Sequence, residues 1–142
     1  MSDLLSINEN INSISPRIDI LYVNAGFGKY APIEAVTEEH FDDMFNVLVK
    51  GTLFTVQQVL PLMGEGSSII LNSSNVTKMG MQNSSVYSAA KSAILSFVKT
   101  FAAELSSRNI RINAVSPGPV STNYFDRSNL SKDQIDSIVE YV

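Results

Sequence analysis

Cysteine is absent from this sequence of 142 residues, which excludes a disulfide framework, a thiolate nucleophile and a cysteine-based metal site. Histidine occurs once, as His40, and no group of His, Asp and Glu has the spacing of metal ligands, so we expect no metal. Lysine and arginine number 10 against 14 acidic residues, and no basic run is present. The net charge of −4 therefore argues against nucleic acid or an anionic membrane as a partner.

Long apolar segments are also missing. The first residues have neither the basic region nor the apolar region of a signal peptide. No apolar run approaches the roughly 18–20 residues of a membrane span. The sequence therefore predicts a cytoplasmic protein. With 44% hydrophobic and 17% charged residues, the chain has a globular composition and is long enough for one domain with a core.

Strand and helix patterns alternate along the chain. Short runs rich in β-branched residues predict strands over 18–23, 67–74 and 110–118. Helical spacing of apolar residues predicts helices over roughly the first dozen residues, 37–63, 86–105 and 131–142, with Thr37 and Ser131 as caps. This order implies parallel strands joined by right-handed crossovers. Because the strands are apolar on both faces, we expect both faces of the sheet to be buried.

The three predicted strands end in small, polar, turn-forming residues, over 24–26, 72–75 and 116–122. In parallel sheets, ligands bind beyond the carboxyl ends of the strands, so these segments are candidates for a site. The glycine-rich turn that opens most dinucleotide-binding folds is absent, and the last helical pattern stops at Val142. Such a small sheet would also leave a strand edge exposed. We therefore expect the chain to be part of a larger domain.

A tyrosine and a lysine stand four residues apart, as Tyr87 and Lys91, in the helix predicted over 86–105. That spacing arises by chance in roughly one chain in four of this length. The pair could therefore be an ordinary exposed pair on a helix surface. Its meaning depends on the motifs around it.

Three motifs together carry a family resemblance. Tyr-Val-Asn-Ala-Gly follows the first strand, Ser74 stands 13 residues before the tyrosine of Tyr-Ser-Ala-Ala-Lys, and Pro-Gly-Pro-Val-Ser-Thr follows the third strand. From Asp19 to about Phe125, their order and spacing resemble the short-chain dehydrogenase/reductase family. The resemblance implies an α/β fold, a partial Rossmann-like doubly wound parallel sheet whose first β-α-β-α-β half is absent. Residues 1–142 would then form a single incomplete NAD(P)-binding domain, its central and catalytic portion.

The resemblance also implies hydride transfer between a nicotinamide and a carbonyl or alcohol substrate. Tyr87 would be the acid/base, Lys91 would favour its phenolate and bind the nicotinamide ribose, and Ser74 would hydrogen-bond the substrate oxygen. Ser73 is the rival serine, but it points to the opposite face of the strand. The family's cofactor-binding positions correspond to Asn24, Ala25, Gly26, Tyr87, Lys91, Pro117, Gly118, Val120 and Thr122.

Other properties stay open at this point. The segment that separates NAD from NADP is absent, so either cofactor is possible, and nothing selects a substrate within the carbonyl/alcohol class. The family associates into homo-oligomers, which we expect of the full-length form. The alternative is a non-catalytic truncated remnant or dimerisation module, in which Ala89, Ala90 and Ala93 would allow close helix packing.

One position departs from the family pattern. In the helix before the serine strand, the family commonly has an asparagine three residues before a glycine, where the helix is distorted and holds a water that relays protons to the lysine. Leu48 occupies that position here. Asn46 lies about 200° around a regular helix from it and cannot substitute. We expect a weakened proton relay.

Overall fold

The computed structural model of the chain describes residues 6–120 and 130–140, so the predicted site residue Thr122 lies outside the described residues. Three strands are present in this part, and each is shorter than its predicted run: β1 Ile20–Val23, β2 Ser68–Asn72 and β3 Arg111–Val115. The helices are α2 Ile7–Asn12, α3 Glu38–Phe45, α4 Gly51–Val59, α5 Ser85–Leu105 and α6 Lys132–Glu140. Single 3₁₀ turns cover Ile33–Ala35, Leu60–Leu62, Asn75–Lys78 and Ser106–Arg108.

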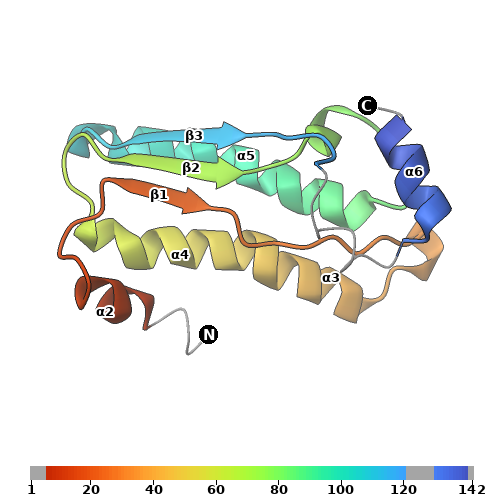
Figure 1. Ribbon diagram of the computed structural model, residues 1–142, viewed down its shortest axis with the longest axis horizontal. Helices are drawn as coiled ribbons and strands as arrows, with labels where there is room; N and C mark the ends of the chain where they lie inside the picture. Colours follow the sequence, from red (N-terminus) through yellow and green to blue (C-terminus); the bar gives the residue numbers. More distant parts are fainter. Residues whose placement is uncertain (1–5, 121–129, 141–142) are drawn as a thin grey trace.

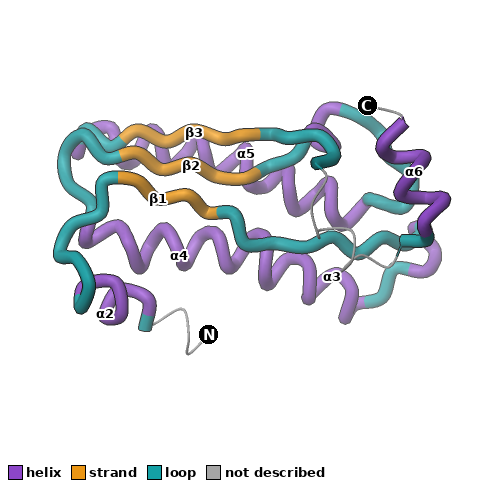
Figure 2. Tube along the Cα trace, in the orientation of Figure 1, coloured by secondary structure: helices purple, strands orange, loops and turns teal. Residues whose placement is uncertain are grey.

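The three strands form one parallel sheet in the order β1-β2-β3 (Figures 1 and 2). In register, Leu21 pairs with Ile69, which pairs with Ile112. The chain leaves β1 through α3 and α4 to reach β2, and leaves β2 through α5 to reach β3. The predicted alternation and parallel pairing are therefore confirmed.

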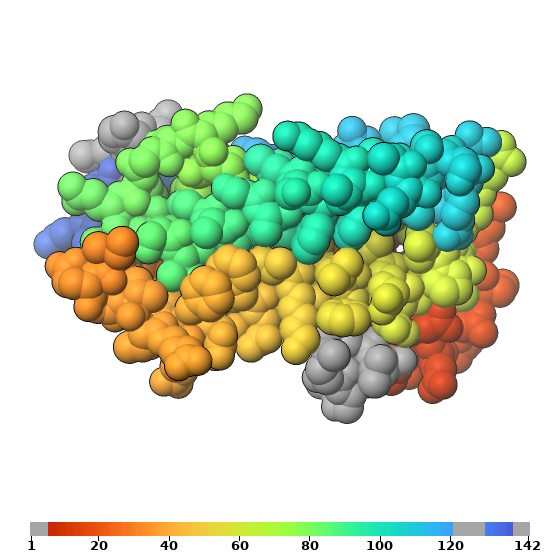
Figure 3. Space-filling model, turned by 180° about the vertical axis from the view of Figure 1, so that it is seen from behind, coloured from red at the N-terminus to blue at the C-terminus, as the bar shows by residue number. Residues whose placement is uncertain are grey.

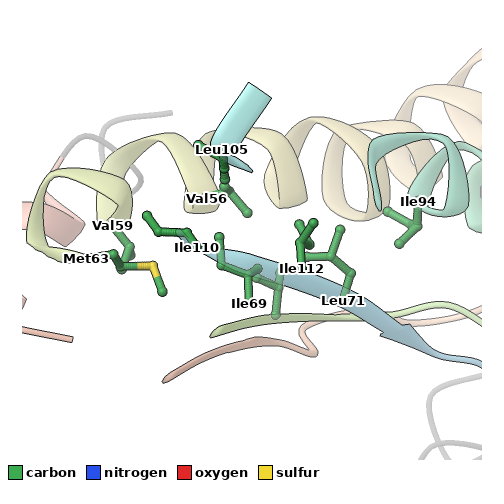
Figure 4. Packing of buried hydrophobic residues seen from close by; sticks show 10 residues of the cluster. Val56, Val59, Met63, Ile69, Leu71, Ile94, Leu105, Ile110 and Ile112 are labelled. Carbon is green, nitrogen blue, oxygen red and sulfur yellow. The ribbon is translucent and has the colours of Figure 1, made fainter. Parts of the chain in front are cut away.

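One face of the sheet is covered by helices. Figure 3 shows α5 and the α3–α4 segment side by side over this face, and Figure 4 shows the side chains that fill the space beneath them. Ile69 and Leu71 of β2 have no exposed surface there, and Ile94 of α5 is 2% exposed. Every second residue of a strand points to the same face, so β2 contributes both of these core residues to one layer.

The other face of the sheet is open, and the expectation of strands buried on both sides is wrong for the described residues. Ile20 is 69% exposed, Tyr22 51% and Val115 43%. The reason lies in the connections. Both crossovers advance across the sheet in the same direction, so a single hand of crossover places both helices on the same side.

The long helical segment begins as predicted and is then interrupted. Thr37 caps α3 by accepting a hydrogen bond from the His40 amide at 3.1 Å. Between α3 and α4, residues Asn46–Lys50 form a π-helical turn, where the sequence predicts one continuous helix. Leu48 lies in this turn and is 2% exposed. The distortion therefore forms without an asparagine at this position.

Candidate active site

The three polar segments at the carboxyl ends of the strands lie together. The Asn72 side chain donates to the Asn24 side-chain oxygen at 2.6 Å, which joins the ends of β1 and β2. The Ser73 amide donates to the Val115 carbonyl at 2.8 Å, and the Asn75 amide donates to the Pro117 carbonyl at 3.0 Å. The predicted meeting of these segments at one edge is thus present in the structure.

Helix α5 places Tyr87 and Lys91 under this edge. They are 7% and 6% exposed, so the alternative of an ordinary exposed helix pair is wrong. The Lys91 ammonium lies 5.8 Å from the centroid of the Tyr87 ring, over its face. A cation and an aromatic ring attract each other at this distance. The two residues form a buried pair at the place where parallel sheets bind ligands.

The Lys91 ammonium is held at the end of β2. It donates a hydrogen bond to the Asn72 carbonyl at 2.8 Å. The ion pairs in the described part of the chain, Arg17–Asp19 and Lys29–Asp43, involve other residues. Burial therefore acts on the ammonium without a compensating carboxylate and lowers the pKa of Lys91 from 10.5 to about 8.

The two candidate serines have different surroundings. The Ser73 hydroxyl donates to the Lys91 carbonyl at 3.0 Å, which fastens α5 to the end of β2. Ser74 begins the 3₁₀ turn, and its hydroxyl oxygen accepts from the Val76 amide at 3.4 Å. This bond uses a lone pair and leaves the Ser74 hydroxyl proton able to turn toward a ligand, apart from a long 3.5 Å contact with the Asn75 side chain. Ser73 therefore joins α5 to β2, whereas the Ser74 hydroxyl proton has only this long contact among the described residues.

Tyr30 was not found from the sequence. Its ring is tilted by 55° against the Tyr87 ring with a centroid distance of 5.7 Å, and it is 7% exposed. The neighbouring Ala31 amide donates to the Asn83 carbonyl at 2.9 Å, which ties this loop to the start of α5. A single aromatic residue in a loop has no periodicity, so no sequence signal marked it.

The predicted cofactor-binding residues surround the end of the sheet where Lys91 lies. Asn24, Ala25 and Gly26 are exposed beyond β1, and Pro117 and Val120 are exposed beyond β3. The Lys91 ammonium has three N–H donors and one hydrogen-bond acceptor among the described residues, so it can also bind hydroxyl groups. The Asn72 side-chain oxygen is a buried acceptor without a partner among the described residues. These donors and acceptors fit the hydroxyl groups of a ribose and the carboxamide of the nicotinamide that is attached to it.

Three other expectations from the sequence concern a metal site, a membrane span and the alanines of α5. No group of three His, Asp or Glu residues could hold a metal ion within 6–120 and 130–140. In the same part of the chain, no helix is both long enough and apolar enough to cross a membrane. Of the alanines expected to allow close helix packing, Ala90 is fully buried within this chain, Ala93 is half-buried and Ala89 is exposed.

Comparison with known proteins gives consistent matches over most of the chain. The sequence profile described as enoyl-(acyl carrier protein) reductase matches residues 2–141. An uncharacterized oxidoreductase of Methylorubrum extorquens is 46% identical over 106 residues, which cover 75% of this chain and 43% of that protein. Versicolorin reductase 1 of Aspergillus parasiticus is 38% identical over 109 residues, which cover 76% of this chain and 42% of that protein.

Solved structures match the fold. A dehydrogenase/reductase from Sinorhizobium meliloti superposes with a TM-score of 0.89 at 25% identity, covering 99% of this chain and 55% of its own. A short-chain dehydrogenase from Burkholderia cenocepacia, solved in complex with NADP, gives a TM-score of 0.82 at 26% identity and covers 87% and 51%. The chain thus spans about half the length of the relatives it matches.

Proposed function

The chain belongs to the short-chain dehydrogenase/reductase family, and we propose that it forms the catalytic portion of an NAD(P)-dependent oxidoreductase that interconverts a carbonyl and an alcohol. The observation that carries this proposal is the buried Tyr87–Lys91 pair at the carboxyl ends of the strands. If the pair were exposed, it would indicate only an ordinary helix surface. A buried phenol beside a buried ammonium supports proton transfer instead.

In the direction of reduction, the Tyr87 hydroxyl gives its proton to the substrate carbonyl oxygen. The Ser74 hydroxyl donates a hydrogen bond to the same oxygen and stabilises the negative charge that develops there. The Lys91 ammonium, 5.8 Å from the ring centroid, favours the phenolate that is left on Tyr87. The chemistry that a nicotinamide would supply, when held beside Lys91, is the hydride for the carbonyl carbon, or its acceptor in the reverse reaction.

For the cofactor, we propose NADP(H) as the first to test, because two structural relatives were solved with NADP bound. Lys91 and the exposed residues beyond β1 and β3 would hold its nicotinamide half. For the substrate, two relatives carry the names versicolorin reductase and hydroxynaphthalene reductase-like protein. A ketone on a fused aromatic ring system is therefore the first substrate class to test.

A chimera tests this function without depending on the length of the chain. The matched 109-residue region of versicolorin reductase 1 is replaced by the corresponding residues of this chain, and oxidation of NADPH and of NADH is followed with the ketone substrate. We expect turnover, and we expect Tyr87→Phe to lower kcat by about 10²–10⁴-fold with little change in NADPH affinity. Tyr22→Phe on the open face is the matched control and should change neither quantity.

The chimera measurements distinguish an enzyme from the alternative, a non-catalytic module. Turnover that persists unchanged in Tyr87→Phe would remove Tyr87 from its role. A chimera that folds by circular dichroism and binds NADPH but turns over none of the ketones would favour the non-catalytic module.

A further inference from the structure

The side chain of Leu48, from the π-helical turn, and the ammonium of Lys91 both approach the backbone of Gly26. Leu48 is 2% exposed, and its Cδ2 atom would lie 2.7 Å from a Cβ atom placed on Gly26. The Lys91 nitrogen lies 4.0 Å from the same point. The methyl group of Leu48 and the ammonium of Lys91 therefore pack against the same side of the Gly26 backbone.

Among the described residues, the Lys91 ammonium has one hydrogen-bond partner and no carboxylate partner. It donates to the Asn72 carbonyl of β2 and lies over the ring of Tyr87, a titratable residue on its own helix. At the Cβ position of Gly26, the apolar Leu48 side chain from the π-helical turn and the Asn24 carbonyl oxygen, 3.9 Å from that position, are the other groups close to the ammonium.

A polar side chain at position 48 would give this small space a hydrogen-bonding partner, and a water molecule needs two or more such partners to be held in a buried place. Leucine offers none. The backbone carbonyl of Leu48 already accepts the Thr52 hydroxyl at 2.6 Å, so it has at most one lone pair left for a further donor.

We propose that Leu48 is a positioning residue that excludes water from the side of the Lys91 ammonium next to the π-helical turn and so makes that side of its surroundings apolar, while its remaining donors stay available to a ligand. The lowered pKa of Lys91, which has burial as its cause, agrees with this role. The consequence for catalysis rests on the proposed function of the Tyr87–Lys91 pair. The ammonium that favours the phenolate is lost at a lower pH than in a hydrated site, so the alkaline limb of the activity profile moves toward neutral pH.

The test measures the lysine itself in the 142-residue chain. Lysine labelled with ¹³C at the ε carbon is followed by NMR from neutral to strongly alkaline pH, and the Lys91 signal is identified by its absence in Lys91→Arg. We expect a titration midpoint near the value of about 8 in the unaltered chain. Leu48→Asn should raise it by about one unit or more, toward the ordinary lysine value.

Two variants serve as controls. Leu48→Met keeps an apolar side chain of similar volume and should leave the midpoint unchanged. Val47→Asn introduces the same amide at the adjacent residue, which is 39% exposed, and should also have no effect. If Leu48→Asn does not fold, Leu48→Ala replaces it, because the shorter side chain leaves room for water and should raise the midpoint in the same direction.

The proposal is overturned if the Lys91 midpoint is the same in the unaltered chain and in the folded Leu48 variants, or if Val47→Asn shifts it equally. Neither cofactor nor turnover enters this measurement. An inactive chimera with a normal Leu48 effect would therefore count against the proposed function alone, and an active chimera without a Leu48 effect would count against the positioning role alone.

Discussion

The two faces of the sheet are made by the same strands and differ completely in their surroundings. On the face beneath α4 and α5, Ile69 and Leu71 are fully buried. On the opposite face, Ile20 and Tyr22 of the neighbouring strand are more than half exposed. Both sets are apolar, so composition does not distinguish them. The difference arises from the crossovers, which place both helices on one side.

This contrast indicates where stability and chemistry reside. The helix-covered side contains the packed core and, at the carboxyl ends of the strands, the buried Tyr87–Lys91 pair. The open side presents exposed apolar side chains that contribute little to the described packing. Substitutions on the two sides should therefore differ in size, and the following predictions run from the largest difference to the smallest.

The largest difference should separate Leu71→Ala from Ile20→Ala. Leu71 is fully buried between the sheet and the helices, so removing its side chain should lower the free energy of unfolding by about 3–5 kcal/mol through lost burial and the cavity left behind. Ile20 is 69% exposed, and its truncation should cost less than about 1 kcal/mol. Urea unfolding followed by circular dichroism measures both. Equal losses would mean that the open face is covered in solution, for instance by a second copy of the chain.

The next prediction concerns Lys91, which is buried on the helix-covered side at the carboxyl ends of the strands. Its pKa is lowered to about 8 in the folded chain against 10.5 in the unfolded chain. Below pH 8 both states bind the proton and the cost of burying the charge is present in full. Between the two pKa values the unfolded chain binds more protons, so the free energy of unfolding rises with pH, by up to about 3 kcal/mol.

Urea unfolding at neutral pH and near pH 10 checks this rise. Lys91→Met removes the titrating group while keeping an apolar stem, so the difference between the two proteins isolates the lysine from the tyrosines that titrate in the same range. The unaltered chain should gain stability relative to Lys91→Met as pH rises. A parallel pH dependence in both would show that water reaches the ammonium in the folded state.

The features that the sequence predicted correctly depend on local signals. Thr37 and Ser131 cap their helices with the expected hydrogen bonds, because a cap needs only a hydroxyl and a nearby backbone amide. Tyr87 and Lys91 share one buried face because residues four apart in a helix always do. The meeting of the strand ends followed from parallel pairing alone.

The features that the sequence missed depend on tertiary contacts. The apolar spacing around Leu48 predicted one continuous helix, and only the family resemblance indicated a distortion at this position, where the structure has the π-helical turn Asn46–Lys50. The open face was missed because Ile20 and Tyr22 are as apolar as buried residues, and periodicity does not report which side a crossover covers. The pairing of Asn72 with Asn24 joins residues 48 apart, which no local signal encodes.

The smallest predicted effect lies at Gly26, whose backbone lies beside both Leu48 and Lys91. Its backbone has no positive φ, so of the two reasons for a glycine here, close approach and a left-handed conformation, only the first applies. A Cβ atom would lie 2.7 Å from Leu48, whose buried side chain has little room to move, so Gly26→Ala should lower the free energy of unfolding by about 1–2 kcal/mol.

Gly80→Ala is the matched control, since its Cβ would contact nothing within 4 Å, and it should be neutral or stabilising by less than about 1 kcal/mol. Combining Gly26→Ala with Leu48→Ala should recover part of the loss in a double-mutant cycle, because the second change removes the atom that the new methyl group meets. If Gly26→Ala costs no more than Gly80→Ala, Leu48 moves aside freely, and the close packing that keeps Lys91 dry does not extend to this end of the sheet.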